Sequence, residues 1–200
     1  MHAIHLTHAR RGLLAAPCTT CTWWQSTPGV RTAPEARPAW ERAIEDDAGL
    51  FGLILLDGDA VIGYMHTAAP RFLPRVACLP AGPPSADAYV LMCAYFHDEE
   101  YLRGFQFLLQ EVAAALKGQG VPALEVFARR HSPNTAPLCG YIRDVNLFQR
   151  DVLEGAGFRV VRVCGEIARL RLDLGTLVDA PRRSARWELR ADGGMAAQPT

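Results

Sequence analysis

The stretch "LFGLILLDGDAVIGYMHTA", from Leu50 to Ala68, constrains the fold of this chain more than any other part of the sequence. Two β-rich runs flank Asp57-Gly58, the dipeptide preferred in tight hairpin turns. The pattern predicts two antiparallel strands joined by a short turn.

Apolar periodicity predicts further strands and helices around this hairpin. Strands are expected at residues 4–6, 87–96, 122–128, 158–164 and 167–174, and helices at 9–16, 38–48, 105–117 and 143–158. We expect Pro17 to stop the first helix and a loop to follow it. The order predicts an α/β (α+β) fold, with a mixed central sheet flanked by helices. We assign residues 1–174 to one domain and 175–200 to a polar C-terminal tail.

Composition argues against several classes of protein. Lys+Arg and Asp+Glu cancel at 21 each, whereas a nucleic-acid binder would show a basic excess. The longest apolar runs, "GLFGLILL" and "AYVLMCAYF", are too short to cross a bilayer. The N-terminus lacks the apolar core of a signal peptide. We therefore expect a cytoplasmic protein with no nucleic-acid or membrane partner.

Six cysteines are scattered along the chain, and in a cytoplasmic protein they are expected to be thiols. Cys18 and Cys21 form a C-x-x-C, which is half of a zinc site. The sequence has no second C-x-x-C and no H-x-x-x-H to complete it. A redox C-x-x-C would follow a strand at a helix N-terminus. We therefore expect no metal, and two thiols packed near Trp23 and Trp24.

Four segments, in this order, resemble the GCN5-related N-acetyltransferase (GNAT) superfamily. They are "AVIGYM" in the hairpin, "YVLMCAYF" leading through an acidic turn to Arg103-Gly104 and a helix, "ALEVFA", and "VLEGAGFRVVR". The segments "CTTCTWWQ" (18–25) and "PRVACLPAGPPSADA" (74–88) also resemble a narrower bacterial subgroup. The resemblance covers roughly residues 4–172.

The resemblance implies a mostly antiparallel sheet and transfer of an acetyl or other acyl group from acyl-CoA to an amine. The acceptor would be a small molecule or a peptide, and a homodimer is consistent with the superfamily. Backbone groups of a splayed central strand would hold the pantetheine, here at Cys93, Ala94, Tyr95 and Phe96.

In the superfamily, a loop of the form Arg/Gln-x-x-Gly-x-Gly/Ala holds the pyrophosphate with backbone N–H groups. The matching residues here are Arg103, Gly104, Phe105 and Gln106. Aligned from Arg103, the two small positions become Gln106 and Leu108. The alternative alignment, which keeps the helix stripe in phase, deletes about three residues of the loop. Either alignment predicts a poorer phosphate cradle.

The acid and base positions of the superfamily are also altered. A tyrosine usually lies four residues before the final Gly-Phe, and here Leu153 takes its place. Tyr95 and Tyr141 are the remaining candidates for the acid, unless both are packing aromatics. The turn with His97 and Glu99 is the best place for a base, although carboxylates there also suit a helix cap.

Candidate substrate residues come from two segments. Trp24 and Gln25 end the C-x-x-C segment, where the subgroup has Trp-Glu, and glutamine cannot accept the proton that a glutamate would. Arg129 and His131 follow the strand at 122–128 and suit a carboxylate or phosphate, or form a solvated basic loop.

Three functions remain open. The first is an N-acyltransferase with an atypical pyrophosphate loop. The second is a catalytically silent protein of the same fold that acts as a binding or regulatory module. The third keeps the pocket of the fold for other small-molecule chemistry. A cleft filled by Phe105, Gln106 or Phe107 would favour the second.

Overall fold

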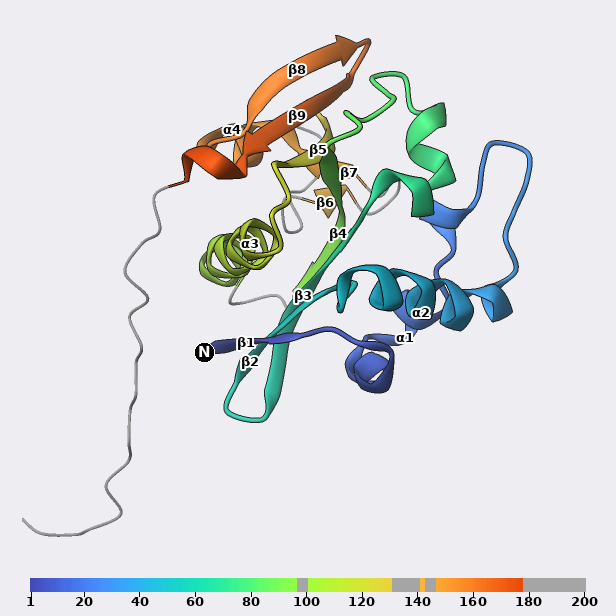
Figure 1. Ribbon diagram of the computed structural model, residues 1–200, viewed down its shortest axis with the longest axis vertical. Helices are drawn as coiled ribbons and strands as arrows, with labels where there is room; N and C mark the ends of the chain where they lie inside the picture. The colour runs from blue at the N-terminus through green and yellow to red at the C-terminus, as the bar shows by residue number, and fades with distance from the viewer. Residues whose placement is uncertain (97–100, 131–140, 143–146, 178–200) are drawn as a thin grey trace, which may run out of the picture.

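The computed structural model describes residues 1–96, 101–130, 141–142 and 147–177, and the side chains of all of these except 101–102 and 141–142. In this part of the chain, nine strands form one sheet (Figure 1). They are β1 (His2–His5), β2 (Gly52–Asp57), β3 (Ala60–Ala68), β4 (Ala88–Phe96), β5 (Ala123–Arg129), β6 (Tyr141–Ile142), β7 (Leu147–Gln149), β8 (Arg159–Cys164) and β9 (Ile167–Asp173).

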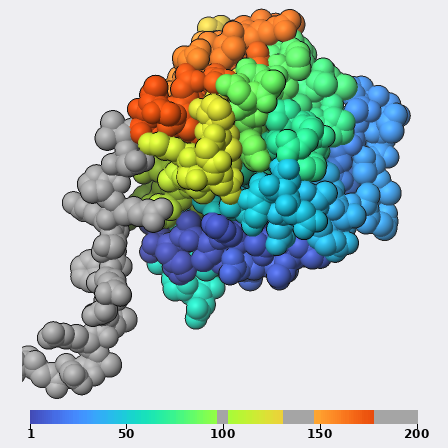
Figure 2. Space-filling view, in the orientation of Figure 1, coloured from blue at the N-terminus to red at the C-terminus, as the bar shows by residue number. Residues whose placement is uncertain are grey.

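Helices cover both faces of the sheet. They are α1 (Ala16–Thr20), α2 (Arg37–Ala48), α3 (Tyr101–Gly118) and α4 (Arg150–Gly155), with short 3-10 turns such as η2 (Trp23–Gln25). Figure 1 shows α3 on one face and α1 and α2 on the other. In Figure 2 the N-terminal segments, in blue, cover one side of the molecule, and the orange β8–β9 hairpin stands at the opposite end.

Each face of the sheet has its own hydrophobic core. The α3-side core contains Leu55, Met65, Leu91, Ala94, Phe96, Phe105, Leu108, Leu109, Val112, Leu116, Leu124, Val126, Phe148 and Leu153, among others. The α2-side core contains Leu6, Leu14, Trp24, Ile44, Phe51, Ile54, Tyr64, Leu73, Val76, Val90, Met92, Phe127 and Leu147, among others. A sheet with two buried faces explains why its strands read as nearly continuous apolar runs.

The predicted hairpin is confirmed. Strands β2 and β3 pair antiparallel up to Asp57 and Ala60, and Gly58 takes the positive φ of 57° that the turn requires. Strand β4 pairs antiparallel with β3 and parallel with β5, while β9 pairs antiparallel with β5 and β8. The sheet is therefore mixed and mostly antiparallel, as the sequence predicted.

An irregularity in β4 opens the sheet at its centre. The register between β3 and β4 shifts at Met92, because His66 pairs with Cys93 whereas Thr67 pairs with Leu91. This bulge puts two consecutive residues, Met92 and Cys93, on the α2 side. Strand β4 pairs with β5 only from Ala88 to Leu91, although β3 follows it as far as Phe96. The two parallel strands therefore diverge beyond Leu91.

Strand β7 lies in this opening. One edge of β5 is paired with β9 along its whole length, from Ala123 to Arg129. The pairs that β7 makes with Ala128 and Arg129 must therefore use the edge that faces β4. A short strand of the chain itself thus lies beside β5 where β4 has moved away.

Three predicted helices differ from the structure. The helix expected at 143–158 is wrong, because Leu147–Gln149 is extended and only α4 is helical within the described part of that range. Helix α3 begins four residues before the expected start at Phe105. The helix expected at 9–16 is a 3-10 helix, His8–Leu13. Pro17 lies in the first turn of α1 instead of stopping a helix, since proline is compatible with a first turn.

Candidate functional site

The end of β4 that lies beyond its pairing with β5 is the first part of the site. Four predicted cofactor residues lie here, beyond the last residue that pairs with β5. Cys93 and Tyr95 point to the α2 side, whereas Ala94 and Phe96 are buried on the α3 side. Any role of Ala94 and Phe96 toward a ligand is therefore restricted to their backbone groups.

The start of α3 is the second part. Only residues 97–100 separate β4 from α3, and the predicted base candidates His97 and Glu99 lie outside the described residues. The four predicted pyrophosphate residues lie inside the first two turns of the helix instead of in a loop. Arg103 and Gln106 are exposed, and Gly104 and Phe105 are buried against the sheet.

Gly104 has a packing role. A Cβ at this position would lie 3.2 Å from Leu55 Cδ2 and 3.2 Å from Phe96 Cε1. The glycine therefore allows α3 to approach β2 and β4 closely. The first backbone N–H groups of α3 have no intrahelical acceptor, as at the start of any α-helix, and the positive end of the helix dipole favours an anion or a carboxylate there.

Two tyrosines from neighbouring strands stack on the α2 side of the opening. The rings of Tyr64 and Tyr95 are 5.2 Å apart between centroids, with 15° between their planes. The Ala15 backbone N–H donates to Tyr64 Oη at 3.1 Å. Burial raises the pKa of Tyr64, so its hydroxyl stays protonated near neutral pH.

His66 and Cys93 form a neutral pair beside the bulge. His66 Nδ1 lies 3.1 Å from Cys93 Sγ, and the imidazole is fully buried. Burial lowers the pKa of His66 well below its usual value and raises the pKa of the Cys93 thiol. The pair is therefore an imidazole and a thiol, and it lacks the imidazolium–thiolate character of a nucleophilic cysteine.

The predicted substrate residues Trp24 and Gln25 are buried in η2, with exposed fractions of 3% and 9%. Among the residues that the structure describes, Trp24 Nε1, Gln25 Oε1 and Gln25 Nε2 find no hydrogen-bond partner. His66 Nε2 and Thr67 Oγ1, on β3, are buried without a partner as well.

The two segments of the predicted subgroup motif contact each other. The Arg75 guanidinium stacks on the Trp23 ring, 4.4 Å from its centroid, and Arg75 Nε donates to the Trp23 carbonyl at 2.5 Å. Residues 18–25 and 74–88 thus meet on the α2 side of the sheet. Cys18 and Cys21 are free, half-buried thiols, and Cys18 packs against the α2-side core. The described residues contain no cluster of three His, Cys, Asp or Glu side chains that could hold a metal ion.

The remaining predicted site residues give little evidence for or against a ligand site. Arg129 is ion-paired with Glu166, so its charge is already compensated. His131 lies outside the described residues, and Tyr141 lies in β6 with its side chain outside them. Leu153, at the position of the family's tyrosine, is fully buried in the α3-side core.

Sequence analysis missed a buried carboxylate, Glu125 on β5. It accepts hydrogen bonds from Ser85 Oγ at 2.6 Å, Ser85 N at 3.0 Å and Arg169 Nη1 at 2.8 Å. These bonds fix the proline-rich loop that ends at Ser85 against the sheet. The available signal was a single acid inside the apolar run "ALEVFA".

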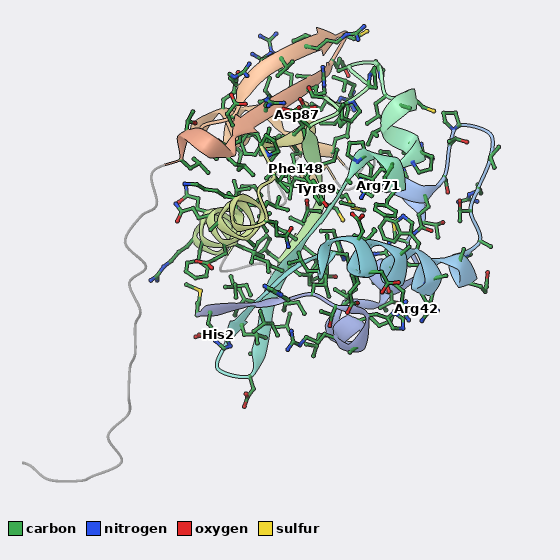
Figure 3. All side chains as sticks on the ribbon, viewed as in Figure 1. His2, Arg42, Arg71, Asp87, Tyr89 and Phe148 are labelled. Atoms are coloured by element: carbon green, nitrogen blue, oxygen red, sulfur yellow. The ribbon has the colours of Figure 1, made fainter. Side chains whose placement is uncertain are left out.

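A shallow cavity of about 230 Å³ lies at the opposite end of the sheet, near the start of β4. Figure 3 labels three of its lining residues, Arg71, Asp87 and Tyr89. Arg71 pairs with Asp47, and Asp87 pairs with Arg171, so these charges are compensated within the chain. Across the described helices, none is long and apolar enough to span a membrane.

Solved structures share this architecture. Aminoglycoside 6'-acetyltransferase type Ii aligns with a TM-score of 0.54 at 9% identity, over 90% of this chain and 100% of that chain. A protein of the GNAT family from Desulfovibrio desulfuricans aligns with a TM-score of 0.50 at 14% identity, over 86% and 98%. The Salmonella typhimurium protein YncA, solved with its cofactor acetyl-CoA, aligns with a TM-score of 0.51 at 14% identity, over 91% and 98%.

Sequence comparison adds nothing to these similarities, since no family model and no curated protein matches the chain. At these identities the structural matches define the fold alone. The chain has the fold of the GCN5-related N-acetyltransferases, in agreement with the predicted fold class.

Proposed function

We propose that this protein is an N-acyltransferase that uses acyl-CoA as the acyl donor and an amine as the acceptor. The observation that carries the proposal is the divergence of β4 from β5 beyond Leu91, produced by the bulge at Met92. Residues 93–96 continue to pair with β3, but the pairing of β4 with β5 ends at Leu91. Polar backbone groups of β4 beyond that point suit the amide groups of pantetheine.

The chain's own residues have distinct roles in this proposal. The exposed Arg103 and the first N–H groups of α3 attract the pyrophosphate. The neutral amine nitrogen forms a bond to the thioester carbonyl carbon and gives up one proton to water, the C–S bond breaks, and the leaving thiolate takes a proton. Tyr95, stacked on Tyr64, is the donor we assign to that proton.

The contact between the Trp23 and Arg75 segments supports the narrower assignment to the bacterial subgroup with these two motifs. In this assignment the α2 side of the opening receives the acceptor.

One observation favours the second candidate, a silent binding module of the same fold. Strand β7 pairs with β5 in the opening itself, and Phe148 packs on Phe105 with ring centroids 6.2 Å apart. If β7 fills the space that the pantetheine needs, acyl-CoA is excluded. Phe105 does not fill the cleft, because it is buried in the α3-side core.

Calorimetric titration with acetyl-CoA, with free CoA as the control ligand, tests the proposal. We expect a micromolar Kd, and a loss of about tenfold or more in Arg103→Glu, because the reversed charge repels the pyrophosphate. The matched control is Arg42→Glu, an exposed arginine on α2 at the other face of the sheet (Figure 3). Its affinity should equal that of the wild type.

Absence of binding at millimolar acetyl-CoA would remove the acyltransferase proposal and leave the binding module. Equal losses in Arg103→Glu and Arg42→Glu would instead show that the N-terminus of α3 is not the pyrophosphate site.

A further inference from the structure

The short helix η2 presents two buried side chains whose hydrogen-bonding atoms have no partner within the described part of the chain. Trp24 Nε1 is one donor, and the Gln25 carboxamide offers both a donor and an acceptor. A buried polar group without a partner destabilises a protein, so such groups are rare unless a ligand or ordered water uses them. Two adjacent residues with three such atoms are therefore informative.

The segment around these side chains is well fixed. Thr22 Oγ1 donates to the Thr32 carbonyl at 2.7 Å, Thr32 Oγ1 donates to the Gln25 carbonyl at 2.9 Å, and Ser26 Oγ donates to the Thr22 carbonyl at 2.8 Å. The hydroxyl groups of Thr22, Ser26 and Thr32 thus all donate within the loop. The unused atoms belong to the two side chains that point into the molecule.

Trp40, on the neighbouring helix α2, provides the contrast. Its Nε1 donates to the Phe72 carbonyl at 2.7 Å, which is the usual arrangement for a partly buried indole. The same fold region therefore satisfies one indole N–H and leaves the other unused.

The surrounding charges indicate the chemistry of a ligand. The nearby buried charges Arg37 and Glu41 are paired with each other. A buried ammonium beside Gln25 would lack a free carboxylate among the described residues of this segment, which is unfavourable. The other cation at this segment, Arg75, already stacks on the Trp23 ring and donates to the Trp23 carbonyl. A carboxamide or peptide group matches better, because its carbonyl accepts from Trp24 Nε1 or Gln25 Nε2 and its N–H donates to Gln25 Oε1.

We propose that Trp24 and Gln25 bind a neutral carboxamide or peptide group of the acceptor, so that the acceptor is an amine that carries an amide. This assignment rests on the proposed transfer to an amine. It is tested first in the free protein, which needs neither acyl-CoA nor catalysis.

The first experiment compares the thermal unfolding of Gln25→Met, Trp24→Phe and Trp40→Phe. Gln25→Met should keep or raise Tm, because it removes unpaired polar atoms at nearly constant shape. Trp24→Phe also leaves a void in the α2-side core, so its Tm is compared with that of Trp40→Phe, which loses the same ring volume. Trp40→Phe should lower Tm by about 2–4 °C, because it removes a hydrogen bond that is made. If all three lower Tm alike, the groups are satisfied within the fold and the proposal is wrong.

The second experiment uses four three-carbon amines that differ at one end: β-alaninamide, β-alanine, 1,3-diaminopropane and propylamine. We expect β-alaninamide alone to raise the Tm of the wild type, and the increase to vanish in Gln25→Met and persist in Trp40→Phe. A shift with β-alanine or diaminopropane that survives in Gln25→Met, or no shift with any amine, overturns the proposal.

With acetyl-CoA present, the same amines separate the two proposals. The KM for β-alaninamide should rise about tenfold or more in Gln25→Met at unchanged affinity for acetyl-CoA. A Tm increase with β-alaninamide in a protein that does not bind acetyl-CoA would reject the acyltransferase and retain the amide site.

Discussion

At the scale of single residues, Glu125 shows how one buried charge positions a whole loop. The carboxylate is completely buried on β5, where Arg169 neutralises it and Ser85 donates two further hydrogen bonds. A buried ion pair adds little net stability compared with apolar packing, but removal of one partner is costly. Glu125 therefore acts chiefly to place the loop before β4 against the sheet.

Substitution of Ser85 by alanine tests this role. The variant loses the donor that lies 2.6 Å from Glu125 Oε1, so we expect the free energy of unfolding to fall by about 1–3 kcal/mol. Thr176→Ala is the control, because its hydroxyl donates to a backbone carbonyl on the surface and its loss should cost well under about 1 kcal/mol. Denaturant titrations measure both values, and equal losses would contradict the role assigned to Ser85.

At the scale of elements, the sequence predicts those strands, turns and helices that depend on residues close together in the chain. Asp57-Gly58 specifies the hairpin, and the apolar stripe from Leu108 to Leu116 specifies α3. The run 143–158 has a helical pattern, yet Leu147 and Phe148 enter opposite cores because β7 pairs with β5. Tertiary pairing overrides local periodicity there, and the sequence carries no local signal of it.

Two glycines of α3 provide a test of how the helix packs on the sheet. Gly104→Ala should lower stability by about 1 kcal/mol, since its Cβ would press on Leu55 and Phe96 at 3.2 Å. Gly118→Ala has open space around the new methyl group and should raise stability by about 0.5–1 kcal/mol, as alanine favours a helix. The two values come from the same denaturant titrations.

A gain of stability in Gly104→Ala would show that α3 lies further from the sheet than the structure has it. It would also reopen the interpretation of Gly104 as a residue that admits a ligand phosphate.

At the scale of the whole molecule, the hydrophobic cores on the two faces of the sheet differ in the polar atoms that they bury. The α3-side core is built mainly from apolar side chains, with the Thr67 hydroxyl beside Leu91, whereas Trp24, Gln25 and His66 bring several polar atoms without a partner among the described residues to the α2 side. This asymmetry was not predictable from the sequence, because it depends on pairs such as His66 and Cys93, which are 27 residues apart. Sequence analysis did select Trp24 and Gln25, but only through a resemblance to a family motif.

His66 makes the stability of the whole molecule depend on pH. Burial holds its folded pKa well below the usual value of about 6.5, so below that pH the unfolded state binds the extra proton. The contribution is complete above pH 6.5 and is lost as the pH falls toward the folded pKa. We expect the free energy of unfolding to fall by up to about 1.4 kcal/mol per pH unit between pH 6 and 5.

The matched variant is His66→Gln, whose unfolding should lack this part of the slope. Asp87 and Asp173 do not contribute to this slope. Hydrogen bonds from Arg171 lower the pKa of both carboxyl groups, so these groups change the free energy of unfolding only below about pH 4. Denaturant titrations at pH 7, 6 and 5 compare the two proteins. Equal slopes would mean that His66 can take up a proton in the folded state, and that the α2 side is open enough to water to solvate the imidazolium.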